Sequence, residues 1–230
     1  MKLLAFETAT EACSVALWID GEVCERFELA PRRHAELSLP WAGQLLAEAG
    51  IAKSQLDAIA VGRGPGAFTG VRLAIAIAQG IALALDKPVL PVSTLAALAM
   101  RAHGERVVAA IDARMGEVYC AAFARNGDGL VTLSEEAVAK PDAVVIPDGD
   151  DWDGVGTGFG AVENALQTHL RGRLTFVDAA ALPHAADVAR LGALAFARGD
   201  AMAPERIEPA YLRNNVALTL IEQQALRASR

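Results

Sequence analysis

The stretch VGRGPGAFTGVR, residues 61–72, holds the residue types most suggestive of chemistry. Its glycines follow an apolar run and precede a helix-like run, which is where phosphate-binding loops lie. A Walker loop also needs a Lys followed by Ser or Thr, and a dinucleotide-binding loop needs GxGxxG spacing, and the stretch has neither. Amides at the helix start could still hold an anion, whereas the alternative is a tight turn whose glycines only permit close packing. The candidate phosphate contacts are Gly64, Gly66, Thr69, Gly70 and Arg72.

The segment RRHAELS, residues 32–38, is the best candidate for a metal site, because it places His34 near Glu36. A helical metal pair takes ligands at i and i+4, and the second position here is Ser38. The three cysteines form no CxxC pair, which disfavours both a thiolate zinc site and a redox dithiol. We therefore expect no metal site, and a metallopeptidase is disfavoured.

The helix expected over residues 69–87 is apolar nearly all round: between residues 71 and 85 its strongly polar side chains are Arg72 and Gln79. Such a helix must be buried on several sides, and a membrane span needs roughly 20 apolar residues, so we expect no membrane contact. Small residues every four positions permit close helix approach. One face can cover the chain's own sheet, and the other is covered by the preceding helix or by a partner.

The candidate interface residues are Leu37, Trp41, Gly70, Ala74, Ala78 and Ala82. Ala78→Arg is predicted to abolish pairing without unfolding the chain.

The order of predicted elements indicates two copies of one mixed unit. The first copy has strands at 2–6, 13–19, 22–29, 56–62 and 88–93, with helices at 34–50, 69–87 and 94–104. The second restarts with a strand–turn–strand over 107–124, followed by strands at 130–134 and 143–147 and helices at 162–170 and 187–199. FETATEACSVAL aligns with IDARMGEVYCAA without a gap. This duplication predicts an α/β fold of the RNase H-like, actin/Hsp70/sugar kinase superfamily, with domains at 1–103 and 104–230.

Glu7 and Asp112 take equivalent places in the two copies, each at the end of an apolar strand. In this superfamily architecture, acids so placed flank the interdomain cleft and hold magnesium–phosphate groups. The alternative for each is solvation of a strand end and capping of a turn. Both acids are therefore candidate nucleotide contacts.

The composition limits the classes of partner. The chain has 230 residues, of which 53% are hydrophobic, and a formal net charge of −7. This charge gives no electrostatic basis for the chain to bind nucleic acid without a partner. The start MKLLAFETAT is typical of a first strand rather than of a signal peptide, so we expect a cytoplasmic protein.

Several segments together resemble the bacterial TsaB (YeaZ) family: RRHAEL, LDAIAVGRGPGAFTGVRLAIAIAQGIA, DARMGEVY and, near the end, EPAYLRN. The resemblance implies an accessory subunit in the synthesis of N6-threonylcarbamoyladenosine at position 37 of tRNAs that read ANN codons. It implies pairing with the catalytic paralogue TsaD, association with the ATPase TsaE, and self-association as a homodimer through the N-terminal half. The TsaD type carries H-x-E-G-H where this chain has HAELS, which loses the second His.

These features favour a non-enzymatic subunit that contacts tRNA only through its complex. Any ATP or ADP with Mg would occupy a composite site in that complex, with no cofactor belonging to this chain alone. The alternative is an independent ATP-binding phosphotransferase or ATPase of the same superfamily, using Glu7, Asp112 and the glycine loop.

Overall fold

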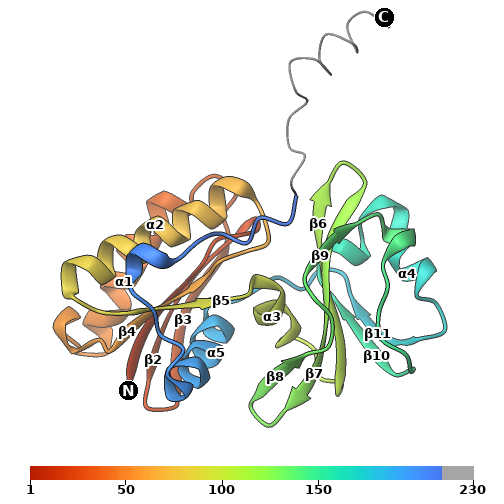
Figure 1. The fold of residues 1–230 in the computed structure, drawn as a ribbon. Helices are drawn as coiled ribbons and strands as arrows, with labels where there is room; N and C mark the ends of the chain where they lie inside the picture. Colours follow the sequence, from red (N-terminus) through yellow and green to blue (C-terminus); the bar gives the residue numbers. More distant parts are fainter. Residues whose placement is uncertain (214–230) are drawn as a thin grey trace, which may run out of the picture.

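The computed structural model describes residues 1–213, which form two mixed sheets lying side by side (Figure 1). The first sheet has the order β3-β2-β1-β4-β5. The second has the order β11-β10-β6-β7-β8, and the short strand β9 also pairs with β7. In each sheet three antiparallel strands are followed by two parallel ones, so the two halves share one topology. The predicted duplicated fold is confirmed.

The strands and helices have the following bounds. The first sheet comprises β1 (Lys2–Glu7), β2 (Ala12–Ile19), β3 (Glu22–Leu29), β4 (Ala58–Gly62) and β5 (Val89–Val92). The second comprises β6 (Arg106–Arg114), β7 (Glu117–Asn126), β8 (Gly129–Thr132), β9 (Ala137–Ala139), β10 (Trp152–Val155) and β11 (Leu174–Asp178). The α-helices of the described residues are α1 (His34–Glu48), α2 (Phe68–Leu85), α3 (Thr94–Ala99), α4 (Ala165–His169) and α5 (Ala185–Arg198).

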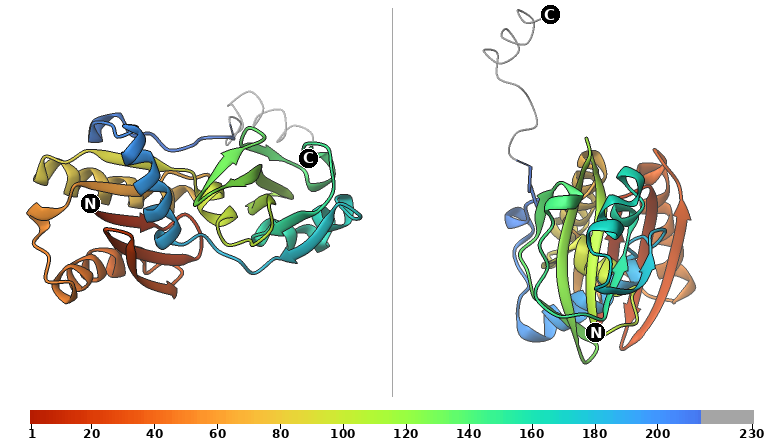
Figure 2. Two further views of the ribbon diagram at one scale, coloured as in Figure 1. Left: turned by 90° about the horizontal axis from the view of Figure 1, so that it is seen from below. Right: turned by 90° about the vertical axis from the view of Figure 1, so that its right-hand side faces the viewer.

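Helices cover both faces of the first sheet. Side chains of α1 and α2 join one core with Leu4, Phe6 and Ile59 of the sheet. On the other face, α5 packs against β1, β2 and β4, although it follows the second sheet in sequence (Figure 2). The predicted boundary between residues 103 and 104 separates the strands of the two sheets. The helix α5 comes after this boundary in sequence but packs against the first half.

The helix α3 also connects the two halves, in the reverse sense to α5. It belongs to the first half in sequence, yet Leu95 and Leu98 share a core with Val107 and Phe123 of the second sheet. Because its side chains are buried on most sides, α3 couples the two sheets by packing rather than by a flexible linker.

Most predicted elements of the first half are confirmed, whereas the second half differs. The strand predicted at 143–147 is wrong: Val144 and Ile146 are buried and Val145 is 85% exposed, which mimics strand alternation without a ladder partner. The short strands β9, β10 and β11 are not predicted by the pattern. Pro40 lies inside α1, beyond its first turn.

The helix α2 has 18 residues and a mean hydropathy of 1.7, long and apolar enough by those measures alone to cross a membrane. The core helix of a soluble protein passes the same test. Here α2 lies on the first sheet and packs against β4 and β1.

Candidate functional site

The glycine loop between β4 and α2 is packed tightly against the turn that follows β1. A β-carbon at Gly70 would lie 2.0 Å from the Thr8 carbonyl oxygen, and one at Gly66 would lie 2.5 Å from the Ala9 carbonyl oxygen. The Thr8 hydroxyl donates to the Gly70 carbonyl at 2.7 Å, and the Ala67 amide donates to the Ala9 carbonyl at 2.7 Å. The glycines are therefore needed for close backbone packing, which is the alternative that the sequence left open.

Glu7 is buried beneath this loop, with 1% of its surface exposed. Its carboxylate accepts hydrogen bonds from the Ala9 amide at 2.7 Å and from the Thr94 hydroxyl at 2.9 Å. Burial raises the pKa of Glu7 to about 7. The same Thr94 hydroxyl accepts from the Gly64 amide at 3.2 Å, so Glu7 and Gly64 belong to one internal network. The expectation that Glu7 faces the cleft beside Asp112 is corrected, because its oxygens are directed inward.

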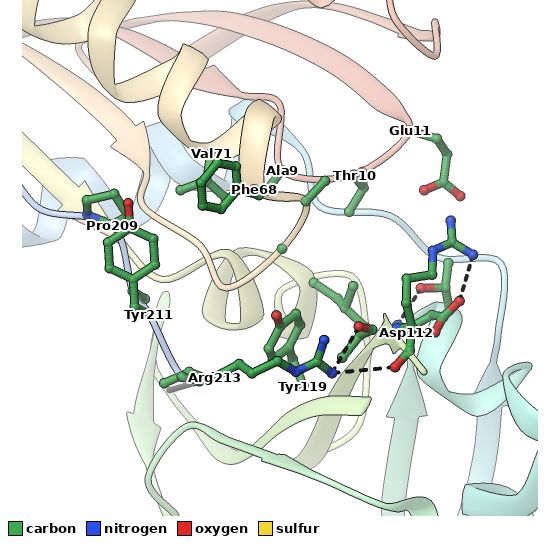
Figure 3. Close-up of a pocket in the computed structure, with 18 of the residues that line it drawn as sticks. Ala9, Thr10, Glu11, Phe68, Val71, Asp112, Tyr119, Pro209, Tyr211 and Arg213 are labelled. Atoms are coloured by element: carbon green, nitrogen blue, oxygen red, sulfur yellow. Dashed lines mark hydrogen bonds and ion pairs between the residues drawn. The ribbon is translucent and has the colours of Figure 1, made fainter. Parts of the chain in front are cut away.

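A cavity of about 540 Å³ lies between the two halves (Figure 3). The first half contributes Thr10, His34 and Gly66 to its wall, and the second contributes Asp112 and Tyr119. This volume lies in the range of small-molecule sites. The amide of Asp112 donates to the Thr157 hydroxyl at 3.1 Å, and its carboxylate pairs with Arg114 at 3.0 Å. Of the two predicted acids, the structure thus places Asp112 at the cavity.

Residues 209–213, which we term the strap, close one side of this cavity and contact both halves. The Ala210 amide donates to the Arg63 carbonyl at 2.8 Å, and the Tyr211 hydroxyl accepts from Arg72 Nε at 2.8 Å. On the second half, Arg213 pairs with Glu117 and donates to the Ala113 carbonyl at 3.2 Å. Arg72, predicted as a phosphate contact, therefore holds Tyr211, while Thr69 is exposed on the first turn of α2.

The small-residue ridge of α2 faces inward. Ala74, Ala78 and Ala82 are fully buried in the core between α2 and the sheet, and Gly70 is buried against the β1–β2 turn. The prediction that this ridge contacts a partner is wrong, because the chain's own sheet covers it. Trp41 packs partly buried against the same core, and Leu37 is half-buried. Neither residue is tested as an interface contact.

The opposite face of α2 is exposed and also consists mainly of small or apolar residues. Ala76, Gly80 and Leu83 lie on it, and a β-carbon at Gly80 would have no atom within 4 Å. The neighbouring helix α1 exposes Leu39, which is 54% accessible, together with Gly43. Both neighbouring helices therefore expose small or apolar residues, and we term Leu39, Gly43, Ala76, Gly80 and Leu83 together the α1–α2 face.

Comparison with known proteins places this fold and site in a family. The family model described as TsaD, tRNA N6-adenosine threonylcarbamoyltransferase, matches residues 28–220. The tRNA threonylcarbamoyladenosine biosynthesis protein TsaB of Escherichia coli (strain K12) is 45% identical over 225 residues, which cover 94% of this chain and 96% of that protein. The protein of the same name from Haemophilus influenzae is 40% identical over 229 residues, covering 94% of this chain and 95% of that protein. The solved structure of YeaZ from Pseudomonas aeruginosa has a TM-score of 0.86 and 49% identity, covering 92% of this chain and 99% of that one. The chain belongs to the TsaB (YeaZ) family.

In this TsaB-family chain the side chains of His34 and Ser38 in the segment HAELS contact backbone carbonyls of the chain itself. Ser38 is fully buried and donates to the His34 carbonyl at 2.7 Å, which places its hydroxyl inside the first turn of α1. Nε2 of His34 is 3.0 Å from the Thr10 carbonyl oxygen. Because a carbonyl only accepts, Nε2 carries the proton in this contact. Within residues 1–213 no group of three or more His, Cys, Asp or Glu side chains could hold a metal ion.

Sequence reasoning missed the strap as part of the site. In the sequence the segment EPAYLRN is only a family pattern, and its last residue lies outside the described residues. Its Tyr and Arg are the side chains that contact the two halves, and they lie more than 90 residues from their partners in sequence. Local spacing carries no signal for contacts of that range.

Proposed function

We propose that this chain is a non-catalytic subunit in the formation of the threonylcarbamoyl group on N6 of adenosine 37 of tRNAs that read ANN codons. In this role it pairs with a TsaD-type catalytic paralogue and works with a TsaE-type ATPase. The names of the TsaB relatives support the pathway. Membership of a family whose model is described as a threonylcarbamoyltransferase supports a paralogous partner.

The α1–α2 face is the observation that carries the pairing. Its exposed positions are mainly small or apolar, which is unusual for a helix surface in water. Small side chains such as Ala76 and Gly80 let a second helix approach closely, and the exposed Leu83 supplies apolar area to bury. Self-association as a homodimer uses the same face, so the homodimer and the heterodimer exclude each other.

Gly80→Arg tests this pairing. The site is exposed and open, and Arg has a higher helix propensity than Gly, so the variant is expected to fold. A guanidinium in the middle of a packed helix pair costs several kcal/mol, so co-purification with the catalytic paralogue is expected to be lost. The matched control is Val145→Arg, which adds the same charge at an 85% exposed apolar residue of the second half.

The outcome is decided by stoichiometry and by activity. Gly80→Arg is expected to remain a folded monomer and to abolish tRNA modification in the reconstituted system, while Val145→Arg behaves like the wild type. Wild-type stoichiometry for Gly80→Arg would show that the α1–α2 face is not the interface.

The net charge supports indirect contact with tRNA. At −7 the chain lacks the excess of Lys and Arg with which proteins neutralise phosphates. Removing the catalytic paralogue from a binding assay is therefore expected to remove tRNA binding by this chain.

The cavity favours a second candidate, which is nucleotide binding. Asp112 and Gly66 line it. In this second candidate function, ATP or ADP with Mg binds there in the complex, at a site shared with the partner. In the independent-ATPase alternative the purified chain hydrolyses ATP without a partner, and Asp112→Ala abolishes that hydrolysis. Substantial turnover of this kind would overturn the accessory-subunit proposal, and we expect none.

A further inference from the structure

The cavity between the halves carries more positive than negative side chains on its wall. The wall includes Arg32, Arg114 and Arg213, and its acids are Glu11 and Asp112. This local excess of positive charge is opposite in sign to the formal net charge of the whole chain, which is −7. A concave site lined by one sign of charge attracts ligands of the opposite sign. The lining therefore favours an anionic ligand.

Glu7 does not fit a magnesium site beside a ligand in this cavity. Its Oε1 accepts a hydrogen bond from the Ala9 amide, and its Oε2 accepts one from the Thr94 hydroxyl. The carboxylate is buried, and Glu7 is not part of the cavity wall. Mg²⁺ needs carboxylate oxygens that are free to coordinate it, and Glu7 offers none to the cavity.

At Asp112 an arginine takes the place that a metal ion would need. The Arg114 amide donates to Oδ1 of Asp112 at 2.8 Å, and Nη1 of the same Arg114 donates to Oδ2 at 3.0 Å. A magnesium ion on this carboxylate would lie next to the guanidinium, and the two positive charges would repel each other. The two acids expected to hold magnesium–phosphate groups therefore do not fit a magnesium site in this chain.

The Arg114 guanidinium can bind an anion while it stays on Asp112. Its side chain is 84% exposed, and its one side-chain hydrogen bond within residues 1–213 uses Nη1. A guanidinium has five N–H donors in a planar fork that matches the oxygens of a phosphate group. The remaining donors can connect the Asp112 carboxylate to a phosphate, as Mg²⁺ does where it binds both a carboxylate and a substrate phosphate.

We propose that the cavity binds a phosphate-bearing ligand without a metal ion, with Arg114 contacting the phosphate in place of Mg²⁺. Arg32 supplies a second positive charge from the wall of the first half. The phosphate belongs to a nucleotide or to a free phosphate compound, and Arg114 recognises the same group in both. The inference rests on the second candidate function, which is nucleotide binding in the cavity, and is independent of the accessory-subunit proposal.

Calorimetric titration of the purified full chain with ADP and with pyrophosphate tests the proposal, in EDTA and in excess Mg²⁺. We expect saturable binding in EDTA and weaker binding with Mg²⁺, because the metal neutralises the charge that Arg114 recognises. Tighter binding of ADP than of pyrophosphate would identify a nucleotide as the ligand, and equal affinities would identify the phosphate group alone.

Two results of this titration would overturn the proposal. Binding that appears only with Mg²⁺ would do so while leaving nucleotide binding in place. Failure of both probes to bind would remove nucleotide binding by this chain as well. Neither result affects the accessory-subunit proposal, which the pairing of Gly80→Arg tests separately.

Arg114→Gln tests the residue that carries the inference. The variant keeps a polar side chain but loses the charge, so the Kd for ADP in EDTA is expected to rise by about tenfold or more. The matched control is Arg171→Gln, at an exposed arginine of the second half that does not line the cavity, and its affinity is expected to equal that of the wild type. An unchanged Kd for Arg114→Gln would overturn the proposal.

Asp112→Asn distinguishes metal-free binding from binding through a magnesium ion. Asn keeps an oxygen that can accept from the Arg114 amide, so the turn is expected to be preserved. Removing a negative charge beside the phosphate is expected to tighten ADP binding in EDTA, whereas a magnesium site would lose its carboxylate ligand. Weaker ADP binding by a folded Asp112→Asn chain would overturn the proposal.

Discussion

The carboxylate of Glu7 and the backbone of Gly62 are in such close contact that a β-carbon on Gly62 would lie 2.0 Å from Glu7 Oε2. Glu7 ends β1 and Gly62 ends the neighbouring parallel strand β4, so the absence of a side chain on one strand makes room for a buried acid on the other. The glycine loop that resembles a phosphate cradle begins at this contact.

Gly62→Ala is expected to destabilise the chain by about 1–3 kcal/mol, because the methyl group displaces a buried and hydrogen-bonded carboxylate. The free energy of unfolding in urea measures this loss. Gly80→Ala is the matched control, since it adds a methyl group in open space on a helix and is expected to stabilise by about 0.5–1 kcal/mol. Equal stability for Gly62→Ala and the wild type would contradict the packing described for Glu7.

Glu7 is expected to make stability depend on pH. Burial raises its pKa from 4.5 to about 7, so between these values the folded chain binds more protons than the unfolded chain. Stability therefore falls as pH rises through this window, by about 3 kcal/mol at most. Glu7→Gln carries no charge at any pH and lacks this loss. We therefore compare the free energies of unfolding of Glu7→Gln and the wild type at pH 5.5 and pH 8.5. The stability of Glu7→Gln relative to the wild type is expected to be higher at pH 8.5 than at pH 5.5. A difference in stability that is the same at both pH values would rule the effect out.

Ala78→Arg is now expected to unfold the chain, contrary to the sequence-based prediction. Ala78 is fully buried against the sheet, and burying a guanidinium there without a partner costs roughly 3–5 kcal/mol. Thermal unfolding of Ala78→Arg beside Gly80→Arg checks the orientation of α2. We expect a large loss of Tm for the first variant and little for the second, and the reverse order would mean that the helix is rotated.

Glu25 is expected to anchor α5 to the first sheet. It accepts hydrogen bonds from the Ser14 hydroxyl at 2.6 Å and the Ala186 amide at 2.9 Å, and it pairs with His184 Nδ1 at 2.8 Å. Glu25→Ala removes these bonds and is expected to cost about 2–3 kcal/mol. Hydrogen exchange of residues 185–198 measures the loosening. Glu22→Ala, an exposed site on the same strand, is the control, and equal exchange in both variants would exclude an anchoring role.

The sequence predicts the duplicated topology because alternation and turn signals are local. It does not predict which face of α2 is buried, since Ala74 and Ala78 on one side and Ala76 and Gly80 on the other offer the same small side chains. Only the position of the sheet decides between them.

The candidate site is predicted in part. Asp112 lies at the cavity as expected, whereas Glu7 does not, although the two occupy equivalent places in the repeat. The inward Glu7 carboxylate accepts from the nearby Ala9 amide and also from the hydroxyl of Thr94, which is 87 residues away. Contacts of that separation leave no trace in local spacing, which also explains why the strap was missed.

The docking of α5 on the first sheet has a consequence for synthesis on the ribosome. The five strands of that sheet are complete at residue 92, but one of its apolar faces is covered mainly by α5, residues 185–198. At roughly 5–20 residues per second, the nascent chain holds this face uncovered for about 5–20 s. In an N-terminal fragment ending near residue 104 that face would stay uncovered permanently. The first half therefore becomes a complete folding unit only when the second half has been made.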